Sequence, residues 1–307
     1  MDKIRGGYLG LCLGDALGSM DTYHEELKYP IVVRSHYMPI RIGAIGQVSD
    51  DSTMATALLF RLLSDRDWIS ENVIKEYMEW ANNYSPFLGK NTRRLFYGIK
   101  TVQGYQNRKY KIDFSLVQSN GSLMRAFPLI LLFYLQPDLV FQRAIEDTNL
   151  TNQNPVNQDA TVIYLLMLYS ALIGEIGSQA LPNILEKCQT EPIRNAIQEA
   201  INKKMRMVNE QKGWVAHAIY LAARAWLKVE ERKTYSEIIK WINLREGDRD
   251  TNSAIAGALI GVVFGENQLK LDQEQNINIL LNSNSQTGQL PYDLKYHPRT
   301  GLDMLRI

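Results

Sequence analysis

Two short acidic motifs stand far apart in the sequence, and each leads directly into an apolar run with helical spacing. The first is Ser49-Asp50-Asp51, and the second is Asp248-Arg249-Asp250-Thr251. Each places two carboxylates and a hydroxyl at the start of a predicted helix. If the fold brings the two helix starts together, these groups form an all-oxygen site. Such a site suits Mg²⁺ or another hard divalent cation.

A simpler explanation for either motif is helix capping. Ser, Thr and Asp are the preferred residues just before a helix, and acids in the first turn suit the helix dipole. Taken singly, each motif favours this structural explanation. Capping needs only one oxygen, however, whereas each motif offers three within a few residues, so a shared binding site is the second explanation.

Glycine spacing connects the helix that follows the second motif with the first predicted helix of the chain. Glycines recur every four residues at Gly6, Gly10, Gly14 and Gly18, and again at positions 257, 261 and 265. Residues at this spacing share one helix face, and glycine inside a helix costs up to about 1 kcal/mol relative to alanine. We therefore predict two central helices in close contact. Asp15, an acid in the first of them, is predicted to bond to a neighbouring helix end rather than to act in catalysis.

The rest of the chain is helical in pattern nearly throughout. Predicted helices begin near Lys3, Asp51, Ser70, Lys90, Gly121, Pro155, Ser178, Glu191, Gly213, Thr234 and Asp250. No alternating β-branched run predicts a sheet, and no change in composition marks a second domain. Residues 1–307 therefore predict a single all-α domain. The segment from Asn267 onward, rich in Asn, Gln and turn residues, predicts an irregular C-terminal wrap.

Composition excludes several classes of protein. Lys plus Arg number 34 and Asp plus Glu 33, so the chain carries no strong nucleic-acid signature. The small basic clusters at 108–111 and 203–206 are expected to be solvated faces. Two cysteines, Cys12 and Cys188, suit a reducing compartment rather than a disulfide framework. The longest unbroken apolar stretch, residues 127–135, is too short to cross a bilayer. These features predict a soluble, intracellular (cytoplasmic) protein without a membrane partner.

Four segments, in this order along the chain, resemble the ADP-ribosylglycohydrolase family. Gly14-Asp15-Ala16-Leu17-Gly18 resembles its opening G-D-A-x-G, and residues 49–54 resemble its T-D-D-T-x-M. Residues 120–128 resemble its N-G-x-x-M-R-x-x-P. Residues 247–251, with the glycine helix that follows, resemble its G-D-T-D-T. Any one of these motifs is weak evidence, but four in the family's order are specific.

The resemblance implies an orthogonal bundle of helices with a site for two Mg²⁺ ions, with Mn²⁺ as an alternative cation. It places the metal ligands at Ser49, Asp50, Asp51, Asp248, Asp250 and Thr251. It places substrate contacts at Asn120, Gly121, Ser122, Met124 and Asn152. Without the resemblance, an ordinary turn before a helix would be the preferred interpretation of Asn120-Gly121.

The activity implied by the resemblance is hydrolysis of the glycosidic bond between ADP-ribose and a modified protein, which releases ADP-ribose. Cleavage at the ribose C1 atom passes through an oxocarbenium-like state. Asp51 or Asp250 would assist the attacking water as a base, and the sequence leaves that choice open. The expected partners are an ADP-ribosylated protein or ADP-ribose itself.

Four positions depart from the family pattern. Ser49 replaces the first Thr of the T-D-D-T-x-M motif and keeps the hydroxyl. Thr22 stands where the family often has a gating Glu, with acids nearby at positions 21, 25 and 26. Asn152 replaces a His, and Arg249 replaces the middle Thr of the last motif, where it either turns outward or pairs with a substrate phosphate. Two other functions therefore stay open. One is a catalytically weak or silent relative that binds ADP-ribose, and the other is a hydrolase of another ribosyl substrate.

Overall fold

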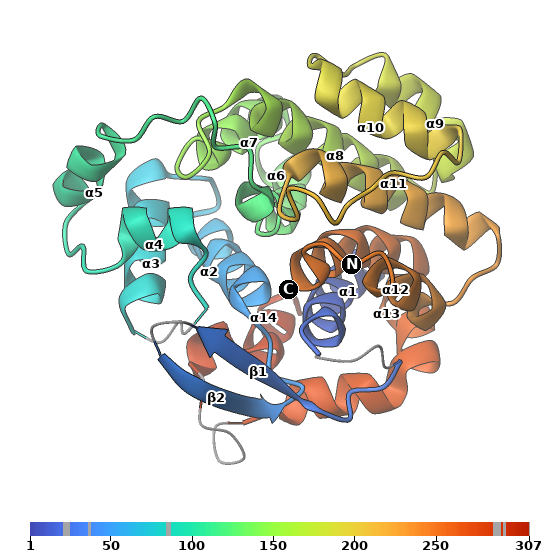
Figure 1. Ribbon diagram of the computed structural model, residues 1–307, viewed down its shortest axis with the longest axis horizontal. Coiled ribbons are helices and arrows are strands. Elements are labelled where there is room, and N and C mark those ends of the chain that lie inside the picture. Colours follow the sequence, from blue (N-terminus) through green and yellow to red (C-terminus); the bar gives the residue numbers. More distant parts are fainter. Residues whose placement is uncertain (21–24, 36–37, 84–86, 285–289, 291–292, 307) are drawn as a thin grey trace.

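Two closely packed helices form the centre of the protein, α1 (Asp2–Gly18) and the first half of α13 (Arg249–Asn282). In this computed structural model the helix backbones approach so closely that a Cβ on Gly10 or Gly14 would collide with backbone atoms of α13. The reverse holds for Gly257 and Gly261, which would collide with α1. The packing predicted from the glycine spacing is confirmed, and Figure 1 shows the pair at the centre of the bundle.

The structure describes residues 1–307 except 21–24, 36–37, 84–86, 285–289, 291–292 and 307. The outer helices are α2 (Asp50–Asp65), α3 (Ser70–Asn83), α4 (Lys90–Phe96), α5 (Val102–Lys109), α6 (Leu132–Leu135), α7 (Val140–Thr148), α8 (Pro155–Ile173), α9 (Gly177–Leu185), α10 (Glu191–Ile201), α11 (Val215–Glu230), α12 (Tyr235–Asn243) and α14 (Pro298–Met304). Short 3₁₀ helices are η1 (Asn120–Ser122), η2 (Phe127–Leu131), η3 (Pro137–Leu139) and η5 (Leu294–Tyr296). The all-α fold class is confirmed.

One small sheet departs from the sequence prediction. Strands β1 (Pro30–Ser35) and β2 (Met38–Ile45) pair antiparallel, where no sheet was expected. The register shifts between Pro30 and Val32 and again between Val33 and Ser35. Such irregularities break the strict alternation of facing residues. The periodic signal of a strand is therefore absent from this segment.

The C-terminal segment was also predicted wrongly, because residues 267–282 are helical. Helix α13 bends at Gly265, whose φ of 74° lies in the left-handed region that favours glycine. Beyond the bend the N–H of Asn267 donates to the carboxylate of Asp2 at 3.1 Å, which acts as a cap for the continuing helix. The expected irregular wrap is therefore replaced by a second half of α13 that α1 holds in place.

The region after Gly121 is a third correction, since it forms turns and 3₁₀ segments rather than a helix that starts there. The carbonyl of Asn120 accepts from the N–H groups of both Leu123 and Met124, and Pro128 lies at the start of η2. Proline lacks the N–H that a continuous α-helix would need at that point. We name residues 119–124, which include η1, the Asn120 loop, and Asn120, Ser122 and Met124 in it are buried.

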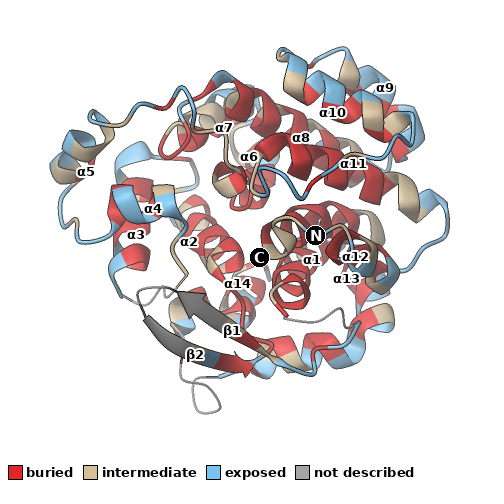
Figure 2. Cartoon of the chain, viewed as in Figure 1, coloured by how far each residue is buried: buried red, intermediate tan, exposed pale blue. Residues whose placement is uncertain are grey.

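Helix α8 has the length and apolar composition of a membrane span, alone among the described helices. More than half of its most apolar window is buried inside the molecule, as in the core helix of a soluble protein. Figure 2 shows buried residues along α8, α11 and the central pair, while α4, α5 and α9 carry more exposed residues. Packing in the core of the molecule therefore explains the apolar composition of α8.

Candidate active site

The first acidic motif caps α2 and is anchored by α1. The Ser49 hydroxyl donates to Asp51 Oδ2 at 2.7 Å, and Asp51 is buried. The carboxylate of Asp15 accepts from the Ser49 N–H, and from the N–H and hydroxyl of Ser52 at 3.0 and 2.6 Å. Asp15 therefore binds the N-terminus of α2, as predicted. The capping explanation and a close grouping of oxygens both hold for this motif.

The second acidic motif follows a tight turn. Gly247 has a φ of 77°, and a Cβ there would lie 2.6 Å from the carbonyl oxygen of Val208. The turn directs Asp248 toward Asn120, whose amide Nδ2 donates to Asp248 Oδ2 at 2.9 Å. Asp250 Oδ1 accepts from the N–H of Thr251 at 2.9 Å. The start of α13 is thereby linked to the Asn120 loop.

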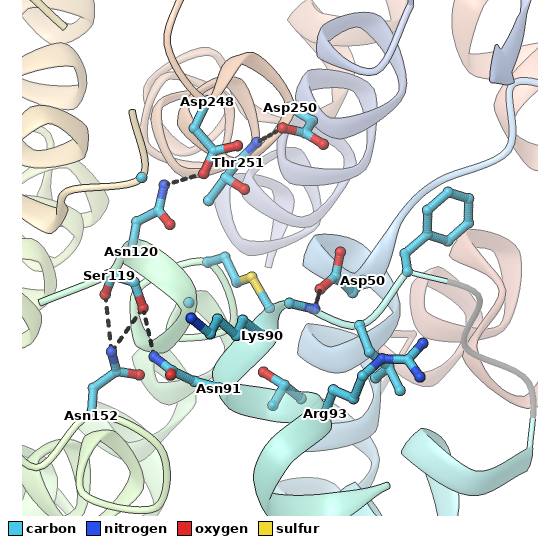
Figure 3. Close-up of a pocket in the computed structure, with 17 residues that line it drawn as sticks. Asp50, Lys90, Asn91, Arg93, Ser119, Asn120, Asn152, Asp248, Asp250 and Thr251 are labelled. Atoms are coloured by element: carbon cyan, nitrogen blue, oxygen red, sulfur yellow. Dashed lines mark hydrogen bonds between the residues drawn. The ribbon is translucent and has the colours of Figure 1, made fainter. Parts of the chain in front are cut away.

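These two helix starts open into one pocket of about 760 Å³, which is large enough for a nucleotide-sized ligand. Figure 3 shows Asp248, Asp250 and Thr251 on one side, Asp50 on the next wall, and α4 opposite. The lining residues are Asp50, Phe87, Leu88, Gly89, Lys90, Asn91, Thr92, Arg93, Ser119, Asn120, Gly121, Met124, Asn152, Gly213, Asp248, Asp250 and Thr251.

Burial and mutual repulsion destabilise the charged forms of these carboxylates. Burial, and then the charge of Asp250, raise the pKa of Asp248 to about 7 and that of Asp50 well above its ordinary value. Burial followed by the charge of Asp15 raises the pKa of Asp51. Burial also raises the pKa of Asp15 to about 6, although hydrogen bonds from Ser52 and Ser49 oppose the rise. Like charges in a poorly solvated site favour protons or cations.

Some hydrogen-bonding capacity in this region is unused. The Oδ1 atom of Asp51 is buried and has no hydrogen-bond partner, and neither amide atom of buried Asn252, one turn into α13, has one. Within the described ranges, no three acidic, His or Cys side chains already converge closely enough to hold a cation. The acids therefore lie around a common region, but their oxygens are not yet arranged as the ligands of one cation.

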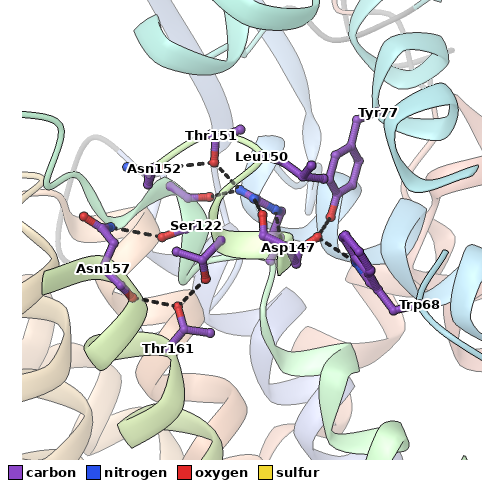
Figure 4. A network of polar contacts seen from close by, with 12 residues as sticks. Trp68, Tyr77, Ser122, Asp147, Leu150, Thr151, Asn152, Asn157 and Thr161 are labelled. Carbon is purple, nitrogen blue, oxygen red and sulfur yellow. Dashed lines mark hydrogen bonds and ion pairs between the residues drawn. The ribbon is translucent and has the colours of Figure 1, made fainter. Parts of the chain in front are cut away.

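A network of buried polar side chains holds the Asn120 loop through hydrogen bonds (Figure 4). Arg125 donates to the Gly121 carbonyl at 2.8 Å and to the Thr151 hydroxyl at 2.9 Å. Its Nε atom pairs with Asp147 Oδ2 at 3.0 Å, and both side chains are buried. Asp147 Oδ1 accepts from Tyr77 at 2.9 Å. The network fixes the position of the loop relative to the pocket.

The structure brings most of the predicted site residues to this pocket. Eight of them line it, namely Asp50, Asp248, Asp250, Thr251, Asn120, Gly121, Met124 and Asn152. Ser49, Asp51 and Ser122 lie behind the wall and are buried. The Ser122 hydroxyl accepts from Asn157 at 3.0 Å, which gives it a structural partner.

The positions that depart from the family pattern have structural partners too. The Asn152 amide donates to the carbonyl and hydroxyl of Ser119 at 3.2 and 3.0 Å. Arg249 donates to the carbonyl of Met20 at 3.0 Å and does not line the pocket. Glu25 pairs with Lys240, and Glu26 pairs with Lys28 at 2.8 Å. The gate position Thr22 and its neighbour Asp21 lie outside the described residues.

The sequence analysis missed the wall that α4 provides. The N–H of Gly89 donates to Asp50 Oδ2 at 3.2 Å, and Asn91 donates to the Ser119 hydroxyl at 3.3 Å. Lys90 and Arg93 lie on the same wall. A usable signal was present, because residues 87–112 contain several cations and no acid.

Comparisons with known proteins identify the family of this chain. A profile of the ADP-ribosylglycohydrolase family matches residues 1–278. The ADP-ribosyl-[dinitrogen reductase] glycohydrolase of Rhodospirillum rubrum is 24% identical over 270 residues, which cover 86% of each chain. An ADP-ribosylarginine hydrolase of Pseudomonas putida is 23% identical, over 86% of this chain and 71% of its own.

A solved structure described as an ADP-ribosylglycohydrolase-related protein complex has the same fold. It superposes with a TM-score of 0.72 and 21% identity, over 99% of this chain and 97% of its own. The family profile covers both acidic motifs, the Asn120 loop and the glycine-faced helices. This chain therefore belongs to the ADP-ribosylglycohydrolase family.

Proposed function

We propose that this protein is an Mg²⁺-dependent hydrolase of the glycosidic bond between ADP-ribose and a modified side chain. The observation that supports it most strongly is the single pocket shared by Asp50, Asp248 and Asp250 with the amide of Asn120. Acids from two distant helix starts and a polar loop thereby face one ligand-sized space. Family membership supports the same class of substrate.

The residues present fit a hard divalent cation. The donors are all oxygens, the class of ligand that Mg²⁺ prefers. The unpartnered Oδ1 of Asp51 and the raised pKa values of Asp50 and Asp248 indicate negative charge that lacks compensation. The residues that would hold the ions are Ser49, Asp50, Asp51, Asp248, Asp250 and Thr251. We expect some of these side chains to rotate toward the cation on binding, since they do not yet converge.

A bound divalent cation would neutralise the carboxylates and bind the hydroxyls of the ribose. The protein's own groups perform the remaining work. The Asn120 loop holds the ADP-ribosyl group against the pocket wall. Asp250 faces the pocket whereas Asp51 lies behind it, so we propose Asp250 as the base. Asp250 accepts one proton of the water as the water oxygen bonds to ribose C1 and the C1 bond to the side chain breaks. The leaving atom takes a proton from the solvent, and Asp250 then returns its own proton to the solvent.

The test is release of free ADP-ribose from proteins modified on arginine or on serine, with Mg²⁺ and with a chelator. We expect release only with the cation, and a loss of about 10²-fold or more for Asp250→Asn, as for removal of a general base. Asp138→Asn, at an exposed acid on η3, is the matched control and should retain full activity. Binding of ADP-ribose without any release would contradict hydrolysis and favour the silent, ADP-ribose-binding alternative.

A further inference from the structure

The segment from 87 to 112 is strongly basic in a chain that is otherwise balanced in charge. It contains seven cations and no Asp or Glu, whereas the whole chain has a net charge of +1. We name this segment the basic rim, and its cations are Lys90, Arg93, Arg94, Lys100, Arg108, Lys109 and Lys111. Charge gathered on one surface is the electrostatic footprint of a polyanion partner.

The cations of the basic rim lack carboxylate partners. Among the ion pairs between described residues, none includes a rim cation, whereas cations elsewhere, such as Arg143 and Lys295, are paired with acids. Arg94, Lys100 and Lys111 are exposed. The positive charge of the rim is therefore available to a partner rather than neutralised within the protein.

The basic rim has a defined structure, because hydrogen bonds and ring stacking join α4 to α5. The guanidinium of Arg108 donates to the carbonyls of Arg94 and Tyr97 at 3.2 and 2.6 Å, which joins α5 to the end of α4. Phe96 and Tyr105 stack beneath them with ring centroids 5.1 Å apart. Figure 1 shows α4 and α5 together on one side of the molecule, and Figure 2 shows their exposed residues.

The rim begins at the pocket itself. The N–H of Gly89 donates to Asp50, and Lys90 and Arg93 line the pocket beside the acids. A chain attached to a sugar in the pocket can therefore leave across α4 and meet the cations beyond it. The small basic cluster at 108–111, expected from the sequence to be solvated, is part of this surface.

Two tyrosines of the rim are also exposed. Tyr110 is 93% exposed and Tyr97 is 49% exposed, and the guanidinium of Arg93 lies 5.0 Å from the ring centroid of Tyr97. Cations interleaved with open aromatic rings are typical of surfaces that bind single-stranded nucleic acid, because the bases stack on the rings. An acidic protein would pair its carboxylates with the cations, but those carboxylates would not stack on the rings as bases do.

We propose that the basic rim docks a single-stranded nucleic acid that carries the ADP-ribosyl group hydrolysed in the pocket. The hydrolysis rests on the proposed function, whereas the docking does not. In the reaction a water oxygen bonds to ribose C1 as the bond from C1 to the nucleic acid breaks. Asp250 takes one proton of the water, the nucleic-acid atom that carried the sugar takes a proton from the solvent, and Asp250 then returns its own proton to the solvent. The products are ADP-ribose and unmodified nucleic acid.

The docking is tested by fluorescence anisotropy with the full-length protein and a labelled, unmodified single-stranded DNA of about 20 nucleotides, longer than common single-strand site sizes. Arg94→Glu with Lys100→Glu removes two exposed cations that do not line the pocket. We expect binding at least about tenfold weaker, and a salt slope reduced by about 1.4, as for two lost phosphate contacts on a single strand. Tyr110→Ala should weaken binding by about fivefold or more.

The matched control is Lys187→Glu with Arg232→Glu, which makes the same change in net charge at exposed sites outside the rim. Equal loss of DNA binding in both double variants would overturn the docking, because net charge alone would explain it. Displacement of the DNA by polyglutamate at equal charge concentration, with no effect of Tyr110→Ala, would overturn it in favour of an acidic protein.

A second assay separates the two proposals. Release of ADP-ribose from a modified single-stranded DNA should fall at least about tenfold in the rim double variant, in line with its weaker binding, while release from a modified protein should not. DNA binding through the rim without release from any substrate would sustain the docking and overturn the proposed function. Release from modified protein only, with no binding of DNA, would sustain the proposed function and overturn the docking.

Discussion

Gly18, the last residue of α1, lies against Asp250 in the first turn of α13, and a Cβ on Gly18 would be only 2.6 Å from the Asp250 Cα atom. Three residues earlier on α1, Asp15 binds the first turn of α2 through Ser49 and Ser52. One buried helix therefore positions both acidic motifs. Their relative placement depends on close packing against the α1 backbone at Gly18 and on the buried carboxylate of Asp15.

Substitution of Gly18 tests this dependence. Gly18→Ala should destabilise the fold by about 1–3 kcal/mol, the usual cost of an added methyl group in a packed site. It should also weaken Mg²⁺ binding, because Asp250 must move away. Denaturant unfolding and calorimetric titration measure the two effects. Gly104→Ala is the control, since a Cβ there would meet only side-chain atoms, the Thr101 hydroxyl at 3.1 Å and two Ile99 methyl groups at 3.4 and 3.5 Å, and we expect little change.

The acid cluster should behave as one binding site. Asp248→Asn and Asp51→Asn come from different motifs, and each should weaken Mg²⁺ binding strongly in calorimetric titrations, because the remaining acids cannot complete the shell. Asp138→Asn, on the surface, should leave the affinity as it is. Unchanged affinity in both cluster variants would contradict a shared site.

The pH dependence of stability follows from the raised pKa values. The ordinary value for Asp is 3.8, while Asp15 titrates at about 6 and Asp248 at about 7. The folded state therefore holds these protons more tightly than the unfolded state. Their contribution is complete below about pH 4 and is lost as the pH rises through about 6 and 7.

Thermal unfolding with a chelator should accordingly show a midpoint that falls between about pH 5 and about pH 8. With Mg²⁺ the fall should diminish, because the cation replaces the protons, and the gain from Mg²⁺ should be largest at the higher pH. A gain from Mg²⁺ that is the same at both pH values would show that these carboxylates do not bind the cation.

Much of this site could be predicted from sequence, for physical reasons that differ by residue. Glycine spacing is a local signal that indicated the α1–α13 pair, and an acid within an apolar run indicated the bond from Asp15 to a helix end. Asn120 and Asn152 were placed by the family resemblance alone. The hairpin at β1 and β2 was missed because its register shifts hide the strand period. The continuation of α13 past Gly265 depends on Asp2, which is distant in sequence.

The α4 wall was missed for a related reason. Lys90 and Arg93 belong to no catalytic motif, and their importance depends on the contact between Gly89 and Asp50, which only the fold creates. Asn152 illustrates the converse, because a residue aligned with a substrate position has its amide committed to Ser119. Sequence motifs identify the chemistry of side chains, but long-range packing decides which of their atoms remain available to bind a ligand.

Binding of ADP-ribose should raise the thermal midpoint in the presence of Mg²⁺. A ligand that binds only the folded state stabilises by about 2.7 kcal/mol at a hundredfold excess over Kd. Asn120→Ala should reduce the rise, since it removes the donor that orients Asp248. Asn278→Ala, at an exposed position on α13, should not reduce it. No rise at millimolar ADP-ribose would count against both hydrolysis and simple binding.

Variants of the network that holds the Asn120 loop can show whether Arg125 only stabilises the core or also positions the loop. Arg125 and Asp147 are both buried, so Arg125→Met leaves an unpaired carboxylate and should cost about 3–5 kcal/mol. Adding Asp147→Leu removes that carboxylate and should recover much of the stability. The double variant still lacks the bonds from Arg125 to the Gly121 carbonyl and the Thr151 hydroxyl.

We therefore expect the double variant to fold but to show a smaller thermal response to ADP-ribose than the wild type. Denaturant unfolding of the two single variants and the double variant gives the coupling energy of the pair, and titration of the double variant gives the effect on the loop. A double variant with recovered stability and a full response to ADP-ribose would mean that Arg125 stabilises the core without positioning the loop. A recovered fold with a lost response would establish the positioning role, because the stability of the core would then no longer explain the loss.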